Sequence, residues 1–273
     1  MELTVAALQL NSQSDVARNL DEVARLTQVA AARGATLVVL PENFAFMGDT
    51  EAAKLAVAEA LPDGPILRRV RAIARECAVS IVAGGMPEAS EAPERPYNTS
   101  VFVRSDGEVQ AHYRKVHLFD VELADGTTLK ESQATSAGSD VVTVATHGTL
   151  LGMTICYDLR FPELYRRLAE AGSRIVTVPS AFTLTTGKDH WHTLLRARAI
   201  ENQVYVVAAA QHGKHPRGRT TYGKSLIVDP WGEVVAQASE GVGMALATLD
   251  LAYVDRVRAQ IPCLQHRVFD KHR

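Results

Sequence analysis

Three side chains of complementary chemistry each stand where a predicted buried strand ends: Glu42, Lys115 and Cys156. A cysteine nucleophile needs a base that accepts its proton and a cation that favours the thiolate and the oxyanion formed in the reaction. A glutamate and a lysine can supply these two functions. Because open α/β sheets gather their chemistry at the carboxyl ends of strands, the three residues predict a site built around a cysteine nucleophile.

Each of these residues also has an ordinary structural explanation. A buried cysteine is often a small apolar filler, an acid after a strand is often solvated, and a lysine often protects the edge of a sheet. A cysteine–histidine pair is an alternative, although no histidine occupies a recognisable position for it. His190 and His192 are too close in sequence to share a helical face, so we expect no metal site.

Missing motifs and the charge balance exclude several classes of function. The chain has no GxSxG, HExxH, P-loop or strand-linked GxGxxG motif, which disfavours serine hydrolases, zinc proteases and nucleotide or dinucleotide enzymes. The formal net charge is -2 and the basic residues are dispersed, so neither nucleic acid nor an anionic membrane is an expected partner. No apolar run reaches membrane-spanning length, and the first residues do not have the pattern of a signal peptide.

The spacing of the cysteines and the overall composition predict one large domain whose cysteines are reduced. Cys77, Cys156 and Cys263 are far apart and show no CxxC spacing, which argues against a disulfide framework and predicts a cytoplasmic location. The 273 residues are 47% hydrophobic, enough for a sizeable core, and no stretch has the composition of a linker. We therefore expect a single domain over residues 1–273, in which 262–273 is a C-terminal tail that could reach a partner subunit.

The elements that would position the candidate residues alternate between strands and helices, in two halves that each add antiparallel strands. We expect strands at 3–9, 35–40, 80–84, 99–103, 108–113, 141–146, 149–155, 175–178, 204–210, 225–228, 234–236 and 243–249, and helices at 16–30, 50–60, 66–74, 162–171, 190–202 and 252–260. Residues 121–140 lack periodicity and predict an irregular loop, as do residues 185–187. This order predicts two mixed sheets packed face to face with helices outside.

Three separated motifs resemble those of a known family. Pro41-Glu42-Asn43, Arg114-Lys115-Val116-His117-Leu118 and Cys156-Tyr157-Asp158-Leu159-Arg160-Phe161-Pro162-Glu163 are similar to the motifs of the nitrilase superfamily of carbon–nitrogen hydrolases. The similarity covers nearly the whole chain, including 179–183, 195–202 and 222–223. It implies a four-layer αββα sandwich of two mixed β-sheets with helices on the outer faces, and a homodimer or higher oligomer.

The resemblance also implies roles for individual residues. Glu42 matches the general base, Lys115 the lysine that stabilises the oxyanion, and Cys156 the nucleophile. Glu131 matches, through a looser motif, a second glutamate that orients the lysine and the leaving group. The Tyr157 backbone N–H would be the second oxyanion donor, and no cofactor is implied.

Within the superfamily, residues 115–122, 131–132 and 181–191 are most similar to the deaminated glutathione amidase branch. This similarity implies an amidase that hydrolyses the amide of a small α-keto acid through a cysteine thioester. An ω-amidase acting on α-ketoglutaramate is the nearest alternative, and a scaffold protein of the same fold is another. Nitrile hydrolysis is disfavoured, because that branch usually carries Cys-Trp-Glu where this chain has a Cys-Tyr-Asp sequence at 156–158.

Four further residues are candidates for contacts with the substrate: Arg160, Thr183, Thr186 and His190. Arg160 stands at the start of the helix that follows the cysteine, where a guanidinium can pair bidentately with a substrate carboxylate. A salt bridge to a neighbouring acid such as Glu163 is the alternative. The other three belong to the segment 183–191, which we expect to border the substrate.

Overall fold

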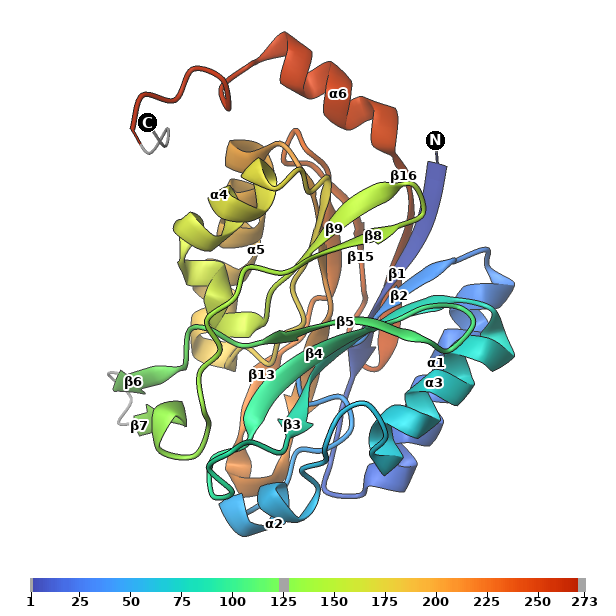
Figure 1. Ribbon diagram of the computed structural model, residues 1–273, viewed down its shortest axis with the longest axis vertical. Helices are drawn as coiled ribbons and strands as arrows, with labels where there is room; N and C mark the ends of the chain where they lie inside the picture. Colours follow the sequence, from blue (N-terminus) through green and yellow to red (C-terminus); the bar gives the residue numbers. More distant parts are fainter. Residues whose placement is uncertain (1, 123–127, 270–273) are drawn as a thin grey trace.

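The computed structural model of the chain describes residues 2–122 and 128–269 and has four layers (Figure 1). Two mixed β-sheets pack against each other, and helices cover their outer faces. The helices are α1 (Val16–Ala32), α2 (Glu51–Ala56), α3 (Pro65–Cys77), α4 (Pro162–Glu170), α5 (Leu184–Asn202) and α6 (Leu251–Gln260). The expected αββα arrangement is therefore confirmed.

The first sheet has eight strands in the described chain, in the order β13-β12-β1-β2-β3-β4-β5, with β16 also pairing with β1. They are β1 (Glu2–Leu10), β2 (Leu37–Val39), β3 (Ser80–Glu88), β4 (Tyr97–Val103), β5 (Val109–Arg114), β12 (Ala210–Lys214), β13 (Thr220–Tyr222) and β16 (Gly243–Asp250). Strands β1, β2 and β3 run parallel, because helices connect them, whereas β4 and β5 form an antiparallel hairpin.

The second sheet has six strands in the order β15-β14-β11-β10-β9-β8. They are β8 (Thr143–Thr146), β9 (Thr149–Met153), β10 (Ile175–Thr177), β11 (Tyr205–Ala208), β14 (Leu226–Val228) and β15 (Val234–Gln237). The central strands β9, β10 and β11 are parallel, and antiparallel strands extend the sheet on both sides. Both sheets thus combine a parallel centre with antiparallel additions.

Side chains of β1 show how the layers form. Val5 and Ala7 belong to the buried cluster that includes the second sheet, α4 and α5, while Ala6 and Leu8 belong to the cluster under α1 and α3. This alternation follows from the pleat, which points successive side chains to opposite faces. Because both faces are covered, the strand is apolar along nearly its whole length.

Local sequence signals define helix α1, which leads into β2. The Asp15 carboxylate caps its start by accepting a hydrogen bond from the Arg18 N–H (3.0 Å). The chain leaves the helix through Gly34 at φ +88°, a conformation that glycine adopts without strain. Within the described ranges, no helix is both long and apolar enough to cross a membrane.

Two loop predictions need correction, although residues 134–140 are irregular as predicted. Residues 121–140 contain the hairpin of β6 (Asp120–Glu122) and β7 (Thr128–Lys130) and a 3-10 turn at Glu131–Gln133; the Asp-Gly pair at 125–126 lies outside the described residues. Helix α5 begins at Leu184, so 185–187 are helical, because the Thr183 hydroxyl caps the first turn by accepting from the Thr186 N–H. The expected helix at 50–60 is also shorter, since α2 ends at Ala56.

The apolar run 204–210, predicted as one strand, is divided between the two sheets. β11 belongs to the six-stranded sheet and β12, which starts at Ala210, belongs to the eight-stranded sheet. A uniform apolar pattern does not reveal this crossing, because the chain is buried on both sides of it. The chain thus passes from one sheet to the other between Ala208, where β11 ends, and Ala210, where β12 begins.

Candidate active site

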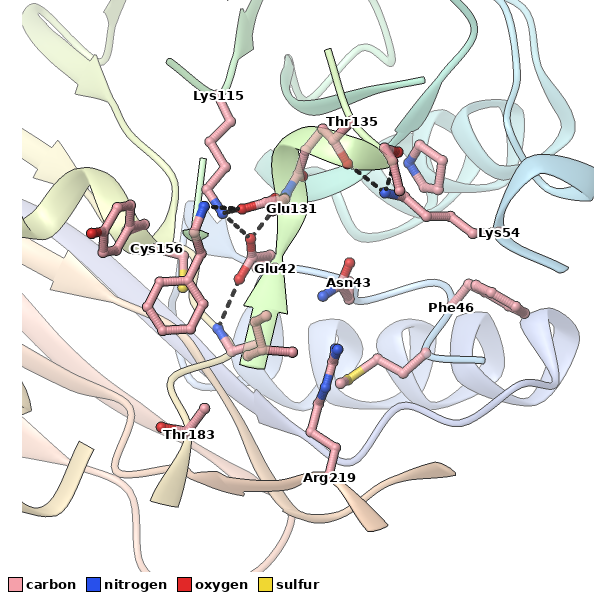
Figure 2. A pocket seen from close by; sticks show the side chains of 18 of the residues that line it. Glu42, Asn43, Phe46, Lys54, Lys115, Glu131, Thr135, Cys156, Thr183 and Arg219 are labelled. Carbon is pink, nitrogen blue, oxygen red and sulfur yellow. Dashed lines mark hydrogen bonds and ion pairs between the residues drawn. The ribbon is translucent and has the colours of Figure 1, made fainter. Parts of the chain in front are cut away.

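One cavity of about 230 Å³ gathers most of the predicted site residues. Its walls include Glu42, Lys115, Glu131, Cys156, Tyr157, Arg160, Thr183 and Thr186. Figure 2 shows hydrogen bonds among the glutamate and lysine side chains of this set beside the cysteine sulfur. Residues 2–122 and 128–269 contain no group of three or more side chains arranged to hold a metal ion.

Cys156 occupies a constrained turn just beyond the end of β9. Its φ is +48°, which is uncommon for a residue other than glycine, and its N–H donates to the Pro179 carbonyl (2.8 Å). Such a conformation costs about 1 to 3 kcal/mol and persists only where the surroundings fix it. The turn places the cysteine side chain in the wall of the cavity.

The buried carboxylate of Asp158 fixes this turn. Its Oδ2 accepts hydrogen bonds from the Ile155 N–H (2.8 Å) and the Tyr113 hydroxyl (2.7 Å). Its Oδ1 accepts from the His117 N–H (3.1 Å) and lies 2.7 Å from His117 Nδ1. Because Tyr113 and His117 flank Lys115, these bonds hold the lysine segment against the cysteine turn.

Glu42 is 3% exposed, and both of its carboxylate oxygens have defined partners. Its Oε1 accepts hydrogen bonds from Lys115 Nζ (3.0 Å) and Asn98 Nδ2 (2.9 Å), and its Oε2 accepts one from the Ala181 N–H (3.1 Å). The same carboxylate adjoins the Cys156 thiol. A carboxylate held in this way is placed to accept the proton of the thiol.

The Lys115 ammonium lies between two carboxylates and is 2% exposed. Its Nζ donates to Glu131 Oε2 (2.8 Å) as well as to Glu42, and Glu131 Oε2 also accepts from the Phe119 N–H (2.7 Å). Burial disfavours the ammonium, but Glu131 and Glu42 outweigh it and hold the lysine pKa well above its usual value. Burial likewise opposes ionisation of Glu131, yet Lys115 keeps the pKa of that carboxyl below its usual value. The lysine therefore stays charged and can stabilise an oxyanion.

The surroundings of the Cys156 thiol favour its protonated form over the thiolate. Burial raises its pKa well above the usual value, and the Glu42 carboxylate raises it further, against the lowering effect of Lys115. Lys115 thus favours the thiolate, as expected of a nearby cation, but burial and the Glu42 carboxylate outweigh its effect on the thiol pKa. The thiol must lose its proton for the sulfur to act as a nucleophile, and Glu42 is the adjacent acceptor.

Three of the predicted substrate-contact residues lie in the cavity wall at the start of helical turns. Thr183 and Thr186 stand at the beginning of α5, with their hydroxyl oxygens 2.9 Å apart. Tyr157 directly follows the cysteine, and its ring packs edge-on against Phe119 at 4.9 Å between centroids. The threonine hydroxyls thus both cap the helix and border the cavity.

Arg160 lines the cavity, whereas His190 does not. The Arg160 guanidinium carbon lies 5.3 Å from the centroid of the Phe182 ring, and its Nη1 is 3.3 Å from Nδ1 of the exposed His190. Among the described residues, no ion pair joins Arg160 to Glu163, so that alternative is wrong. His190 reaches the site only through this arginine.

Several residues of the wall were not identified from the sequence, among them Lys54, Asn98, Arg217 and Arg219. Asn98 Nδ2 bridges Glu42 (2.9 Å) and Glu131 (3.4 Å), but one asparagine inside a strand pattern carries no signal. Lys54 lies on the short helix α2, which shows no charge pattern of its own. The two arginines belong to the stretch 214–219, whose density of basic residues is the signal that could have identified it.

The chain is similar to carbon–nitrogen hydrolases along nearly its whole length. The family model described as "Carbon-nitrogen hydrolase" matches residues 4–259. The deaminated glutathione amidase of Synechocystis sp. is 46% identical over 269 residues, which is 97% of this chain and 97% of the relative. The protein of that name from Homo sapiens is 45% identical over 267 residues, covering 96% of this chain and 81% of the relative.

The same similarity holds in three dimensions. The crystal structure of the C. elegans NitFhit protein matches with a TM-score of 0.92 and 40% sequence identity, covering 100% of this chain and 66% of that chain. The sequence identity extends over nearly all of the chain, and it agrees with the presence of the three motifs and with the four-layer fold. The chain belongs to the carbon–nitrogen hydrolase family, within the nitrilase superfamily.

Proposed function

We propose that the protein is a thiol amidase that hydrolyses deaminated glutathione to 2-oxoglutarate and cysteinylglycine. The observation that carries the proposal is the convergence of Glu42, Lys115, Glu131 and Cys156 on one cavity. It is supported by 46% identity to a relative named deaminated glutathione amidase. The chain retains every acid, base and nucleophile that the chemistry requires, which disfavours a scaffold role.

The first half of the reaction forms a thioester. Cys156 Sγ bonds to the amide carbon while Glu42 takes the thiol proton, and the carbonyl oxygen becomes an oxyanion. The Lys115 ammonium and the Tyr157 N–H stabilise that oxyanion. The C–N bond then breaks as the leaving amine takes the proton from Glu42. Glu131 keeps the lysine charged and oriented throughout.

The second half of the reaction hydrolyses the thioester. A water molecule attacks the acyl carbon and gives its proton to Glu42, and the same lysine stabilises the second oxyanion. The C–S bond breaks, the sulfur recovers a proton, and the free acid leaves. The Glu42 carboxylate thus serves first as base and then as acid in each half of the reaction. Hydrogen bonds to both of its oxygens, from Lys115 and from the Ala181 N–H, hold it in position for these roles.

Arg160 is proposed to bind the carboxylate of the α-keto acid. Its guanidinium faces the cavity without a carboxylate partner among the described residues, and it follows the nucleophile by one turn of chain. An arginine fork binds a carboxylate bidentately, which orients the substrate as well as holding it. Thr183 and Thr186 would contact the same acyl part.

The test compares two substrates that share this acyl part. Deaminated glutathione carries a cysteinylglycine leaving group, whereas α-ketoglutaramate releases only ammonia. We expect a higher kcat/KM for deaminated glutathione, because binding energy from the larger leaving group contributes to the transition state. Equal or faster turnover of α-ketoglutaramate, measured as ammonia release, would move the protein to the ω-amidase function.

We also propose that the protein is a homodimer formed through α4, α5 and the C-terminal tail. Ile200 on α5 is 47% exposed, and Val268 and Phe269 in the tail are 81% and 84% exposed. Arg267 pairs with Glu170, which places this apolar part of the tail against α4. Light scattering should give twice the chain mass of 29.6 kDa. A mass of one chain would refute the dimer.

The proposal places this single-domain amidase in the cytoplasm. All three cysteines are free thiols in the structure. A nucleophilic thiol needs a reducing environment to stay unoxidised. Fractionation of cells that express the protein, with detection of the amidase activity in each fraction, is the measurement that checks this location.

A further inference from the structure

We propose that Lys54 and Arg219 form a subsite for a carboxylate on the leaving group of the substrate. This inference rests on the proposed function and specifies the other half of the molecule that is cleaved. The leaving amine would carry a terminal carboxylate, as a dipeptide does. Arg160 would then bind one end of the substrate, and this second subsite would bind the other.

The two cationic regions have separate surroundings in the cavity. Arg160 packs over the ring of Phe182, next to the start of α5. Lys54 instead contacts the segment that follows Glu131, and Figure 2 shows it on the far side of Glu131 from Cys156. A substrate amide held at the cysteine can therefore extend toward each region with a different end.

Lys54 presents an ammonium whose charge has no direct partner. Its Nζ donates to Thr135 Oγ1 (2.7 Å) and the Ala134 carbonyl (3.3 Å), and an ammonium has a third N–H to donate. None of the ion pairs within residues 2–122 and 128–269 includes it. Burial lowers its pKa, and the carboxylates of Glu131 and Glu51 oppose this only from a distance. A substrate carboxylate would supply a negative charge in direct contact with the Lys54 ammonium.

The Arg219 guanidinium is available to bind a substrate carboxylate. Figure 2 shows it directed into the cavity toward Asn43, and it makes no side-chain hydrogen bond or ion pair in the described part of the chain. The neighbouring Arg217 differs, because it lies 3.8 Å from Glu51. Five N–H donors in a planar fork suit a carboxylate.

The backbone that carries Arg219 is anchored, so its side chain starts from a fixed point. The His215 N–H donates to the Arg219 carbonyl (2.8 Å). The His215 ring is buried and lies 2.8 Å from the Ser12 carbonyl and 2.7 Å from Thr221 Oγ1. A recognition side chain on a fixed loop loses less conformational freedom on binding than one on a mobile loop.

Apolar and cationic side chains both line this part of the wall, a combination that suits a small dipeptide with a terminal carboxylate. Phe46 and Met47 line it, and they provide apolar surface for the side chain next to the scissile amide. The terminal carboxylate would lie beyond them, between the ammonium and the guanidinium. A simple ω-amide has no group that reaches this subsite, so the subsite would give the preference for the larger substrate.

The test uses a pair of substrates that differ only in this charge: deaminated glutathione and its C-terminal carboxamide. Arg219→Gln and Lys54→Gln should each lower the ratio of kcat/KM for acid over carboxamide about tenfold, the effect of one charge-assisted hydrogen bond. Glutamine at position 54 keeps a donor for Thr135. The matched control is Lys214→Gln, an exposed cation of the same segment that does not line the cavity.

Each outcome separates the inference from the function on which it rests. A ratio that stays constant in either variant, or an equal loss for acid and carboxamide, would overturn the subsite and leave the amidase proposal standing. Failure of the unaltered protein to hydrolyse deaminated glutathione would refute the proposed function and the subsite with it. A fall in the ratio for Lys214→Gln would also overturn the subsite, because it would trace the effect to general surface charge.

Discussion

Two regions of the same cavity are built in different ways. In the inner region, Glu42, Lys115 and Cys156 are at most 8% exposed, and neighbours on several segments hold them. In the outer region, Arg160 and Arg219 extend from turns, and their guanidinium groups have few contacts or none among the described residues. The fold fixes the atoms that would react, and long side chains at the rim are left to recognise the substrate.

The difference follows from what each region has to do. Stabilisation of a transition state depends on charges that are already in place, so reorganisation of the inner region would reduce the rate. Recognition of a carboxylate tolerates adjustment, since ordering one long side chain on binding costs only about 0.5 to 1.5 kcal/mol. Substitutions in the inner region should therefore cost far more activity than substitutions at the rim.

Replacement of the proposed nucleophile should have the largest effect. Cys156→Ala is expected to abolish turnover, because among the described residues Cys156 is the one cysteine that lines the cavity and could form the thioester. Iodoacetamide should inactivate the unaltered protein with one equivalent bound at this residue, measured by mass spectrometry. Cys77→Ala and Cys263→Ala are the controls and should keep their activity. Full activity in Cys156→Ala would refute the mechanism.

Loss of the base or of the oxyanion donor should come next. Removal of an oxyanion donor lowers kcat about 10²- to 10³-fold, and we expect that effect for Lys115→Ala. Glu42→Gln should cost at least as much, since the carboxylate acts in both halves of the reaction. Both variants should fold, which circular dichroism would check. Soluble variants with ordinary turnover would show that the inner region is only structural.

A substitution at the rim should cost less. Arg160→Ala is expected to reduce kcat/KM about 10- to 100-fold for substrates with an α-keto carboxylate, the effect of a lost charged hydrogen bond. Lys188→Ala is a matched control, because Lys188 is an exposed cation on α5 outside the cavity. Unchanged rates for both deaminated glutathione and α-ketoglutaramate would rule out the carboxylate contact.

The smallest expected effect is a shift in the pH dependence of Cys156 alkylation between the unaltered protein and Glu42→Gln. Because burial and Glu42 raise the Cys156 pKa, alkylation of the unaltered protein should accelerate only at alkaline pH. Glu42→Gln removes a negative charge that raises this pKa, so the midpoint of alkylation should move to lower pH even as turnover falls. Rates of iodoacetamide modification across a pH series measure the shift. A midpoint that moves upward would contradict the electrostatic account.

Sequence analysis predicted the inner region better than the rim, for physical reasons. Glu42, Lys115 and Cys156 each follow a strand with a clear pattern, so their convergence could be inferred before the structure, and the structure brings them into one cavity. Their catalytic roles stay predictions. Lys54 and Arg219 follow no such pattern, because a side chain that reaches a cavity from a short helix or a loop depends on packing far away in sequence.

The fold was predictable where periodicity was strong. The helices α1 and α4 and the hairpin of β8 and β9 follow directly from apolar spacing, caps and turn residues. The hairpin of β6 and β7 was missed because each strand has only three residues, and one apolar residue between two polar ones is too short an alternation to identify a strand. The start of α5 was missed because the capping threonine resembles other loop residues.

The pairing of β1 has a consequence for synthesis of the protein. Residues Glu2–Gln9 pair with Gly243–Asp250, and the end of β1 also pairs with β12. During synthesis, β1 leaves the ribosome long before its partners β12 and β16. The edge of β1 that pairs with them therefore stays unpaired while most of the chain is translated. An exposed apolar strand edge recruits other chains. Early termination before β16 would therefore yield an aggregating fragment instead of a shorter enzyme, and chaperones that bind nascent chains should act on this first strand.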